Sequence, residues 1–188
     1  MDAHPEIGLT FGAAIELFDD NTRVPRPVAD FKDRKIGSSI LTGTDFIERA
    51  GARNIVPTPT AVVRTELQKH LGGYRHELPH SGDMEMWLRL ASAAPVGVLT
   101  EFQAVYRRHR NNMSLAYSAL ADLEQRKAAL DVFLRSRGHA LRDPGYIQHR
   151  LFWLLACDAD GKAGGAYSGE RCPVMPVRAE CGSAGGHR

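Results

Sequence analysis

The amino-acid sequence, 188 residues long, predicts an α/β body followed by a C-terminal helical extension. Apolar runs with strand character occur at residues 7–18, 96–99 and 104–106. From Asp83 the apolar residues instead follow the spacing of an amphipathic helix. Beyond Ser114 the strand-like runs stop and helix-favouring sequence takes over. Strands that alternate with helices predict the α/β class, and the helical end of the chain predicts the extension.

The N-terminal part predicts one strand and one helix. Residues 7–18 form an apolar run that ends in the turn signal Asp19-Asp20-Asn21, which predicts a strand followed by a turn. Residues 22–42 are polar and contain two prolines, which predicts a surface excursion. Thr44 is a good N-cap with an acid directly behind it, so a short helix is expected over residues 45–50.

The central part predicts a short buried strand and two helices. Residues 54–59 contain two prolines and are expected to be extended or turning, and residues 61–63 are expected to form the buried strand. A helix is expected over residues 65–71, with Gly72 as its C-cap. The helix that begins at Asp83 has an apolar stripe at positions i, i+3, i+4 and i+7: Met84, Trp87, Leu88 and Ala91. Arg89 is expected to point away from this stripe, and Pro95 ends the helix.

The C-terminal part predicts two helices and a tail. Gly138 is expected to end the first helix, and the second is expected over about residues 146–157. The first helix has one apolar stripe: Leu120, Leu123, Leu130, Phe133 and Leu134. Residues 161–188 are rich in Gly, Ala, Pro and Ser without periodicity, which predicts disorder. The expected division is therefore a body over 1–114, a helical extension over 115–160 and a disordered tail.

The composition limits the classes of partner. A hydrophobic fraction of 43% and a charged fraction of 24% are typical of globular domains, and a net charge of +2 is too small to predict nucleic acid or an anionic membrane as partner. No apolar run approaches the roughly 20 residues of a membrane-spanning helix. The first residues lack the features of a signal peptide, so a cytoplasmic location is expected. Three cysteines without a Cys-x-x-Cys pair are expected to be reduced thiols.

The helix that begins at Asp83 carries the first candidate site residues. An aspartate at a helix start is held rigidly and stays ionised through the helix dipole, and the same residue type is also a common helix cap. Glu85 is the second carboxylate there, although acids are favoured in a first turn for dipole reasons alone. Trp87 lies on the apolar stripe, which favours a core position over a role as a sugar-stacking platform.

Two further motifs flank this helix. Gly72-Gly73-Tyr74 precedes it, and a helix C-cap by itself explains one of the two glycines. Tyr106 and three basic residues follow it: Arg107, Arg108 and His109. Taken alone, such a basic group at a strand end is typical of a solvated face. Together the three motifs occur in one order within about forty residues.

This order resembles the acceptor-side half of family 2 glycosyltransferases, which have the GT-A fold. The similarity covers about residues 3–115, and Asp83 and Trp87 match the family pattern of two acids followed by a helix with tryptophan. Gly82 stands where the family has the first acid. The resemblance implies the transfer of a sugar, with inversion, from a nucleotide-diphosphate donor to a hydroxyl of a glycan or other acceptor, as in polysaccharide biosynthesis.

The resemblance also implies roles for the candidate residues. Asp83 would be the general base, and Trp87 would belong to the substrate-binding set. Gly72, Gly73 and Tyr74 would line the sugar subsite, where two glycines let the backbone come close to the sugar. Arg107 and Arg108 would bind the substrate's diphosphate end, and His109 would reach a divalent metal, Mg²⁺ or Mn²⁺.

The family pattern also includes a donor-binding half with an Asp-x-Asp motif, and the sequence does not contain it before Pro5. The main ligands of the metal are therefore expected to be absent, and it stays open whether the chain is active. The implied location is cytoplasmic or peripheral at the inner face of the membrane. The alternative function is a non-enzymatic interaction module, or a degenerate fragment, that self-associates through the helix over residues 115–138.

Overall fold

A five-stranded mixed sheet is the base of the fold. The structure, a computed structural model, describes residues 1–28, 38–141 and 143–163. The strands are β1 (Leu9–Phe18), β2 (Arg23–Arg26), β3 (Ser38–Leu41), β4 (Val62–Val63) and β5 (Val96–Arg108). Their order is β2-β1-β5-β3, with β4 paired to β1. Among the strands of the described residues, β1 and β5 are parallel and the other pairs are antiparallel.

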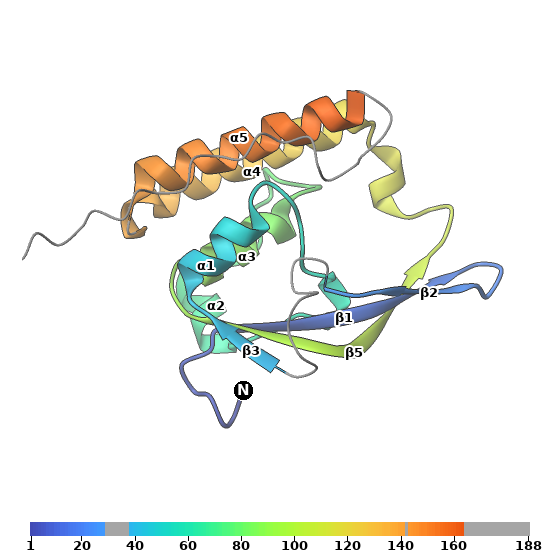
Figure 1. Cartoon of the computed structure of the whole chain (residues 1–188), viewed down its shortest axis with the longest axis horizontal. Helices are drawn as coiled ribbons and strands as arrows, with labels where there is room; N and C mark the ends of the chain where they lie inside the picture. Colours follow the sequence, from blue (N-terminus) through green and yellow to red (C-terminus); the bar gives the residue numbers. More distant parts are fainter. Residues whose placement is uncertain (29–37, 142, 164–188) are drawn as a thin grey trace, which may run out of the picture.

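The helices lie in two layers above one face of the sheet (Figure 1). They are α1 (Gly43–Ala50), α2 (Thr65–Leu71), α3 (Gly82–Ala91), α4 (Ala119–Arg137) and α5 (Pro144–Ala163). Helices α1 and α3 lie between the sheet and the α4–α5 pair, which runs side by side across them (Figure 1). Short 3₁₀ turns cover Thr58–Thr60, Met113–Ala116 and Gly138–Ala140. The α/β class is therefore confirmed.

One hydrophobic core joins the sheet to both helical layers. Phe11 of β1 meets Phe46 of α1 edge to face, with ring centroids 5.9 Å apart. The fully buried members of the core come from all layers: Leu9, Phe11, Phe46, Ile47, Met86, Leu90, Leu130, Phe133 and Leu151. Helices α4 and α5 thus bury their apolar residues against the same core as the sheet. In the predicted stripe of α4, Leu130 and Phe133 are buried, whereas Leu120 is exposed.

Several predicted elements are confirmed. The predicted strand over residues 7–18 is β1, and Asn21 has a positive φ in the turn that follows it. The helix over residues 65–71 is α2, with Gly72 at its C-cap in a positive-φ conformation. Gly138 is the C-cap of α4, as expected.

The predicted break between the strands over 96–99 and 104–106 is wrong. Both belong to the single 13-residue strand β5. Polar residues interrupt the apolar pattern where β5 bulges, and the strand continues beyond them. The bulge appears as register shifts against β1 between Gly12 and Ala14. A β-carbon on Gly12 would lie 3.1 Å from the carbonyl oxygen of Glu101, so glycine permits the close approach.

Other predicted boundaries change for local reasons. The N-cap of α1 is Thr42 rather than Thr44, because the Thr42 hydroxyl accepts from the backbone N–H of Asp45. The predicted surface excursion over 22–42 contains β2 and β3. Val62 of β4 is 57% exposed rather than buried.

At the C-terminal end, α5 extends beyond the expected range, from Pro144 to Ala163. Cys157 is disulfide-bonded, so the expectation of reduced thiols is wrong at this residue. The tail that was expected to be disordered covers residues 161–188. Of these, residues 161–163 belong to α5, and the others lie outside the described part of the chain. None of the helices in the described part of the chain combines the length and the apolarity needed to cross a bilayer.

Candidate functional site

A cleft of about 960 Å³ opens between the N-terminus of α3, the far ends of β2 and β5, and the start of α4. The connections around Asn54 and Tyr74 complete its walls. Its polar and charged lining residues are Arg26, Asn54, Thr58, Tyr74, Arg75, His76, His80, Ser81, Asp83, Tyr106, Arg108, Asn112, Ser114, Asp122 and Arg126. Elements distant in sequence therefore supply one concave site with many polar and charged side chains.

Asp83 lies in the first turn of α3 and faces this cleft half-buried. Its Oδ2 accepts hydrogen bonds from Nδ2 of Asn54 at 2.7 Å and from Oγ1 of Thr58 at 3.0 Å. Its Oδ1 accepts from the backbone N–H of Met84 at 2.8 Å. The side chain therefore satisfies one of the helix's free N–H groups and also presents a carboxylate of fixed orientation to the cleft. Neither Asn54 nor Thr58 was among the candidate site residues predicted from the sequence.

Tyr74 lies beside this carboxylate. Burial, and then the negative charge of Asp83, raise the pKa of the Tyr74 hydroxyl above its ordinary value. The phenol is therefore a neutral hydrogen-bond donor at neutral pH. Its ring meets Trp87 edge to face, with centroids 6.5 Å apart. Trp87 itself is 3% exposed and belongs to the core, and it does not line the cleft.

Arg89 binds the backbone of the loop Gly72-Gly73-Tyr74, called the glycine loop below. Its guanidinium donates to the backbone carbonyls of Leu71, Gly72 and Gly73 at 2.6–3.0 Å. It also pairs with the carboxylate of Glu85 at 2.9 Å. Arg89 is only 3% exposed, so the side of α3 away from the predicted apolar stripe is buried as well.

Glu85, fully buried, also accepts from Arg75 at 3.1 Å. Its carboxylate therefore belongs to an ion-pair network beneath the glycine loop and does not line the cleft. Gly72 and Gly73 do not line the cleft, but the residues that directly follow them, Tyr74 and Arg75, do. The glycine loop thus positions these two side chains.

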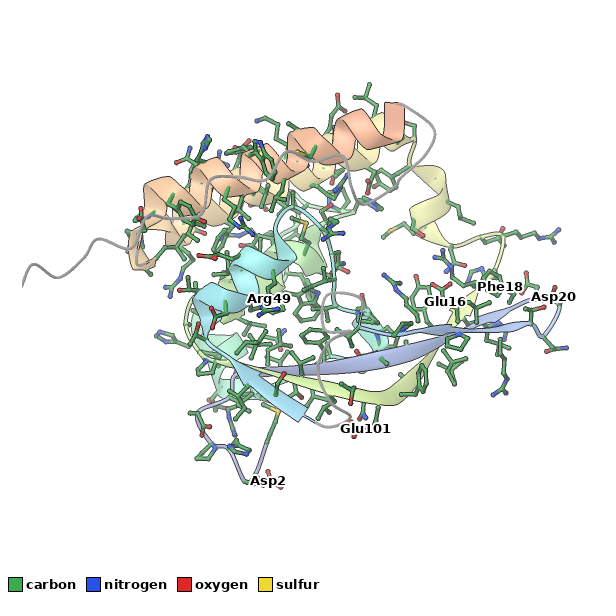
Figure 2. The ribbon with its side chains drawn as sticks, viewed as in Figure 1. Asp2, Glu16, Phe18, Asp20, Arg49 and Glu101 are labelled. Atoms are coloured by element: carbon green, nitrogen blue, oxygen red, sulfur yellow. The ribbon has the colours of Figure 1, made fainter. Side chains whose placement is uncertain are left out.

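The basic residues at the end of β5 lie partly in the cleft and partly in solvent. Arg108 lines the cleft and lies over the ring of Tyr106, 5.5 Å from its centroid. Glu16, near the end of β1 (Figure 2), lies between two arginines, 3.7 Å from Arg108 and 3.6 Å from Arg26. Arg26 also lines the cleft, so this wall is cationic.

Arg107 and His109 are exposed and do not line the cleft. The Nδ1 atom of His109 accepts from the backbone N–H of Asn111 at 3.2 Å. The structure therefore brings Asp83, Tyr74 and Arg108 together around one cavity. It places the five other candidates outside its lining: Gly72, Gly73, Trp87, Arg107 and His109.

A second group of side chains that line the cleft, His80, Asp122 and Arg126, was not predicted from the sequence. The His80 ring nitrogen Nε2 lies 3.0 Å from Oδ1 of Asp122, and Nε of Arg126 donates to Oδ2 of Asp122 at 3.1 Å. Arg126 continues the chain of contacts to the carbonyl of Ala52 at 2.9 Å. His80 and Asp122 are separated by 42 residues, so no motif spacing could have joined them. These contacts tie α4 to the cleft wall.

The metal expected from the resemblance concerns His, Cys, Asp and Glu side chains. Within residues 1–28, 38–141 and 143–163, no three His, Cys, Asp or Glu side chains lie together as a ligand group. Comparisons with protein-family models, with curated proteins and with solved structures found no match to this chain.

Proposed function

We propose that the chain is the acceptor-side part of a family 2 glycosyltransferase with a GT-A fold, and that Asp83 is its general base. The observation that carries the proposal is the Asp83 carboxylate, which faces a polar cleft of about 960 Å³ from the first turn of a helix. Asn54 and Thr58 both donate to the same carboxylate oxygen. A base for an acceptor hydroxyl needs this kind of fixed, ionised and accessible carboxylate.

The proposed reaction is a single displacement with inversion. The acceptor oxygen attacks the anomeric carbon of the donor sugar, and its proton passes to the Asp83 carboxylate as the new bond forms. The bond from the anomeric carbon to the diphosphate oxygen breaks, and its electron pair leaves with the nucleoside diphosphate. Tyr74, a neutral phenol beside Asp83, is placed to donate a hydrogen bond to a sugar or acceptor hydroxyl.

The cationic wall supports the diphosphate end of the donor. Arg26 and Arg108 line the cleft, and one carboxylate, Glu16, lies between them. Arginine pairs with phosphate oxygens through charge-assisted hydrogen bonds, which strengthen as the leaving group gains charge. The divalent cation and its contact with His109 remain predictions from the resemblance, and the proposed chemistry uses only groups of this chain.

Nucleotide binding tests the cationic wall. Titration calorimetry with UDP and with GDP is expected to show saturable binding that is weakened at least about tenfold in Arg108→Gln, because charge-assisted hydrogen bonds are lost. Arg135→Gln is the matched control, since Arg135 is an exposed arginine of α4 outside the cleft lining. A cooperatively folded wild type that binds neither nucleotide would contradict the donor-binding part of the proposal.

Catalysis tests the base. Release of nucleoside diphosphate from a panel of nucleotide sugars is expected to fall about 10²–10⁴-fold in Asp83→Asn, which keeps the shape of the side chain but not the base. Glu101→Gln is the control, because Glu101 is an exposed residue of β5 on the side of the sheet away from α4 and α5 (Figure 2). An Asp83→Asn variant as active as wild type would show that Asp83 is not the base.

The alternative interaction module has less support. It requires the apolar stripe of α4 to pack on a partner helix, but Leu130 and Phe133 are fully buried within this chain. Only Leu120, at the beginning of the stripe, is largely exposed. The stripe therefore serves the internal core, and no second function is proposed from it.

A further inference from the structure

The segment from Arg107 to Leu120, which joins β5 to α4, exposes large apolar side chains at the mouth of the cleft. Met113 is 60% exposed, Leu115 62% and Leu120 66%. Asn112, Met113 and Ser114 of the same segment line the cleft. Three large apolar side chains are therefore more than half exposed within eight positions of the sequence, which favours an interaction site over scattered surface residues.

The same segment is basic. Arg107, His109 and Arg110 are exposed, and neither Arg107 nor Arg110 forms an ion pair with another described residue. No acidic residue occurs between Glu101 and Asp122 in the sequence. Leu17 of β1 pairs with Arg23 on one side and with Arg107 on the other, so these two arginines flank it on one face of the sheet. The segment that exposes the apolar side chains therefore also exposes positive charge, at Arg107, His109 and Arg110.

Local contacts fix the segment although its apolar side chains are exposed. The ring of Tyr117 stacks on His80, with centroids 4.0 Å apart and an interplanar angle of 22°. Ser118 caps α4 by accepting from the backbone N–H of Ala121 at 3.2 Å. At the other end, the amide of Asn112 donates to the carbonyl of Arg107 at 3.4 Å. The exposure of Met113 and Leu115 is thus built into the fold.

We propose that this segment docks on an anionic phospholipid surface. Exposed apolar side chains enter the boundary between headgroups and acyl chains, and flanking arginines are attracted to anionic headgroups. The basic block at residues 107–110 directly precedes the exposed Met113 and Leu115, so cations and apolar side chains are available within one short segment. A protein partner is the competing occupant, and the test below distinguishes the two. The proposal does not depend on the proposed enzymatic function.

Vesicle sedimentation of the full chain tests this. The wild type is expected to co-sediment with vesicles of phosphatidylcholine and phosphatidylglycerol, and not with phosphatidylcholine alone, and to be released by salt. In the double variant Arg107→Gln, Arg110→Gln, the vesicle partition coefficient is expected to fall about fivefold for each of the two charges removed. It is expected to fall at least about tenfold in Met113→Ser with Leu115→Ser. A tryptophan reporter, Met113→Trp, is expected to shift its emission to the blue on the anionic vesicles.

The controls are an exposed apolar and an exposed basic residue elsewhere, Val62→Ser and Arg135→Gln, which are expected to sediment like wild type. Thermal melts of all variants check that each one folds. Absence of wild-type binding at low salt, or equal binding to both kinds of vesicle, overturns the proposal. So does a Met113→Ser and Leu115→Ser variant that sediments like wild type. Self-association of the wild type that this variant loses, without any vesicle binding, would assign the surface to a second copy of the chain instead.

Discussion

At the scale of the residue, Asp83 shows how one side chain combines a structural and a chemical role. One of its oxygens accepts from the backbone N–H of Met84 and so serves the helix start. The other accepts from Asn54 and Thr58 at the wall of the cleft. Capping and presentation of a carboxylate therefore do not exclude one another, because they use different atoms.

The pKa of Tyr74 reports directly on the charge of Asp83. Burial is the larger cause of the raised pKa of the Tyr74 hydroxyl, and the Asp83 carboxylate is the second. Asp83→Asn removes the second cause only, so the pKa of Tyr74 is expected to fall toward its ordinary value without reaching it. Spectrophotometric titration of the phenolate measures this, and Tyr74→Phe identifies which of the tyrosine signals belongs to this residue.

The same shift has a consequence for stability at high pH. The folded pKa of Tyr74 lies above the unfolded value of about 10, so its contribution to stability is complete below that pH. The contribution is lost as the pH rises through the folded pKa, because the unfolded chain releases the proton more readily. Tyr74→Phe is therefore expected to lose less stability above pH 10 than wild type. An unchanged pKa of the Tyr74 hydroxyl in Asp83→Asn would mean that the two side chains do not interact in solution.

At the scale of the element, α3 carries a buried ion-pair network that holds the glycine loop. Glu85 is fully buried between Arg75 and Arg89, and Arg89 also binds three backbone carbonyls. Glu85→Gln leaves buried guanidinium charge without its partner, so the free energy of unfolding is expected to fall by about 3–5 kcal/mol. Urea denaturation measures the loss.

A surface ion pair in which the same Glu→Gln substitution can be made provides the control for this prediction. Glu66 and Lys69 of α2 form an ion pair of 3.0 Å, with side chains 86% and 68% exposed. Because exposed pairs are screened by water, Glu66→Gln is expected to change the free energy of unfolding by less than about 1 kcal/mol. Equal losses in Glu85→Gln and Glu66→Gln would mean that the buried network contributes no more than a surface contact.

The sequence predicted elements better than it predicted contacts. Local signals were sufficient for α2 and for the strand β1, because a periodic apolar run and a C-cap glycine act within a few residues. They failed for β5, where a bulge against β1 interrupts the pattern without ending the strand. They also did not predict the burial of Arg89, because its partners in the Leu71–Gly73 backbone are distant in the sequence.

The candidate site was predictable only in part for the same reason. Asp83 and Arg108 are marked by local motifs and line the cleft. Asn54 and His80 contribute through partners 29 and 42 residues away, respectively, and such pairings depend on how the layers stack. Arg107, next to Arg108, is exposed outside the lining, because successive residues of a strand point to opposite faces.

At the scale of the whole molecule, the helices beyond residue 115 share one core with the sheet. Phe133 of α4 and Leu151 of α5 are fully buried in the same cluster as Phe11 and Trp87. A core that spans all layers favours unfolding of the described part as one cooperative unit. The chain also provides two reporters in different layers, Trp87 in α3 and Trp153 in α5.

This arrangement leads to a prediction about cooperativity. In a Trp153→Phe background the fluorescence reports Trp87 alone, and adding Phe133→Ala is expected to lower the unfolding free energy seen at Trp87 by about 3–5 kcal/mol. The reason is the cavity left in a core that α3 and α4 share. Urea titration followed by fluorescence and by far-ultraviolet circular dichroism is expected to give coincident transitions. If Phe133→Ala left the transition at Trp87 in place and shifted only part of the dichroism signal, α4 and α5 would unfold independently of the sheet. The cleft wall formed by His80 and Asp122 would then open without unfolding of the Asp83 side.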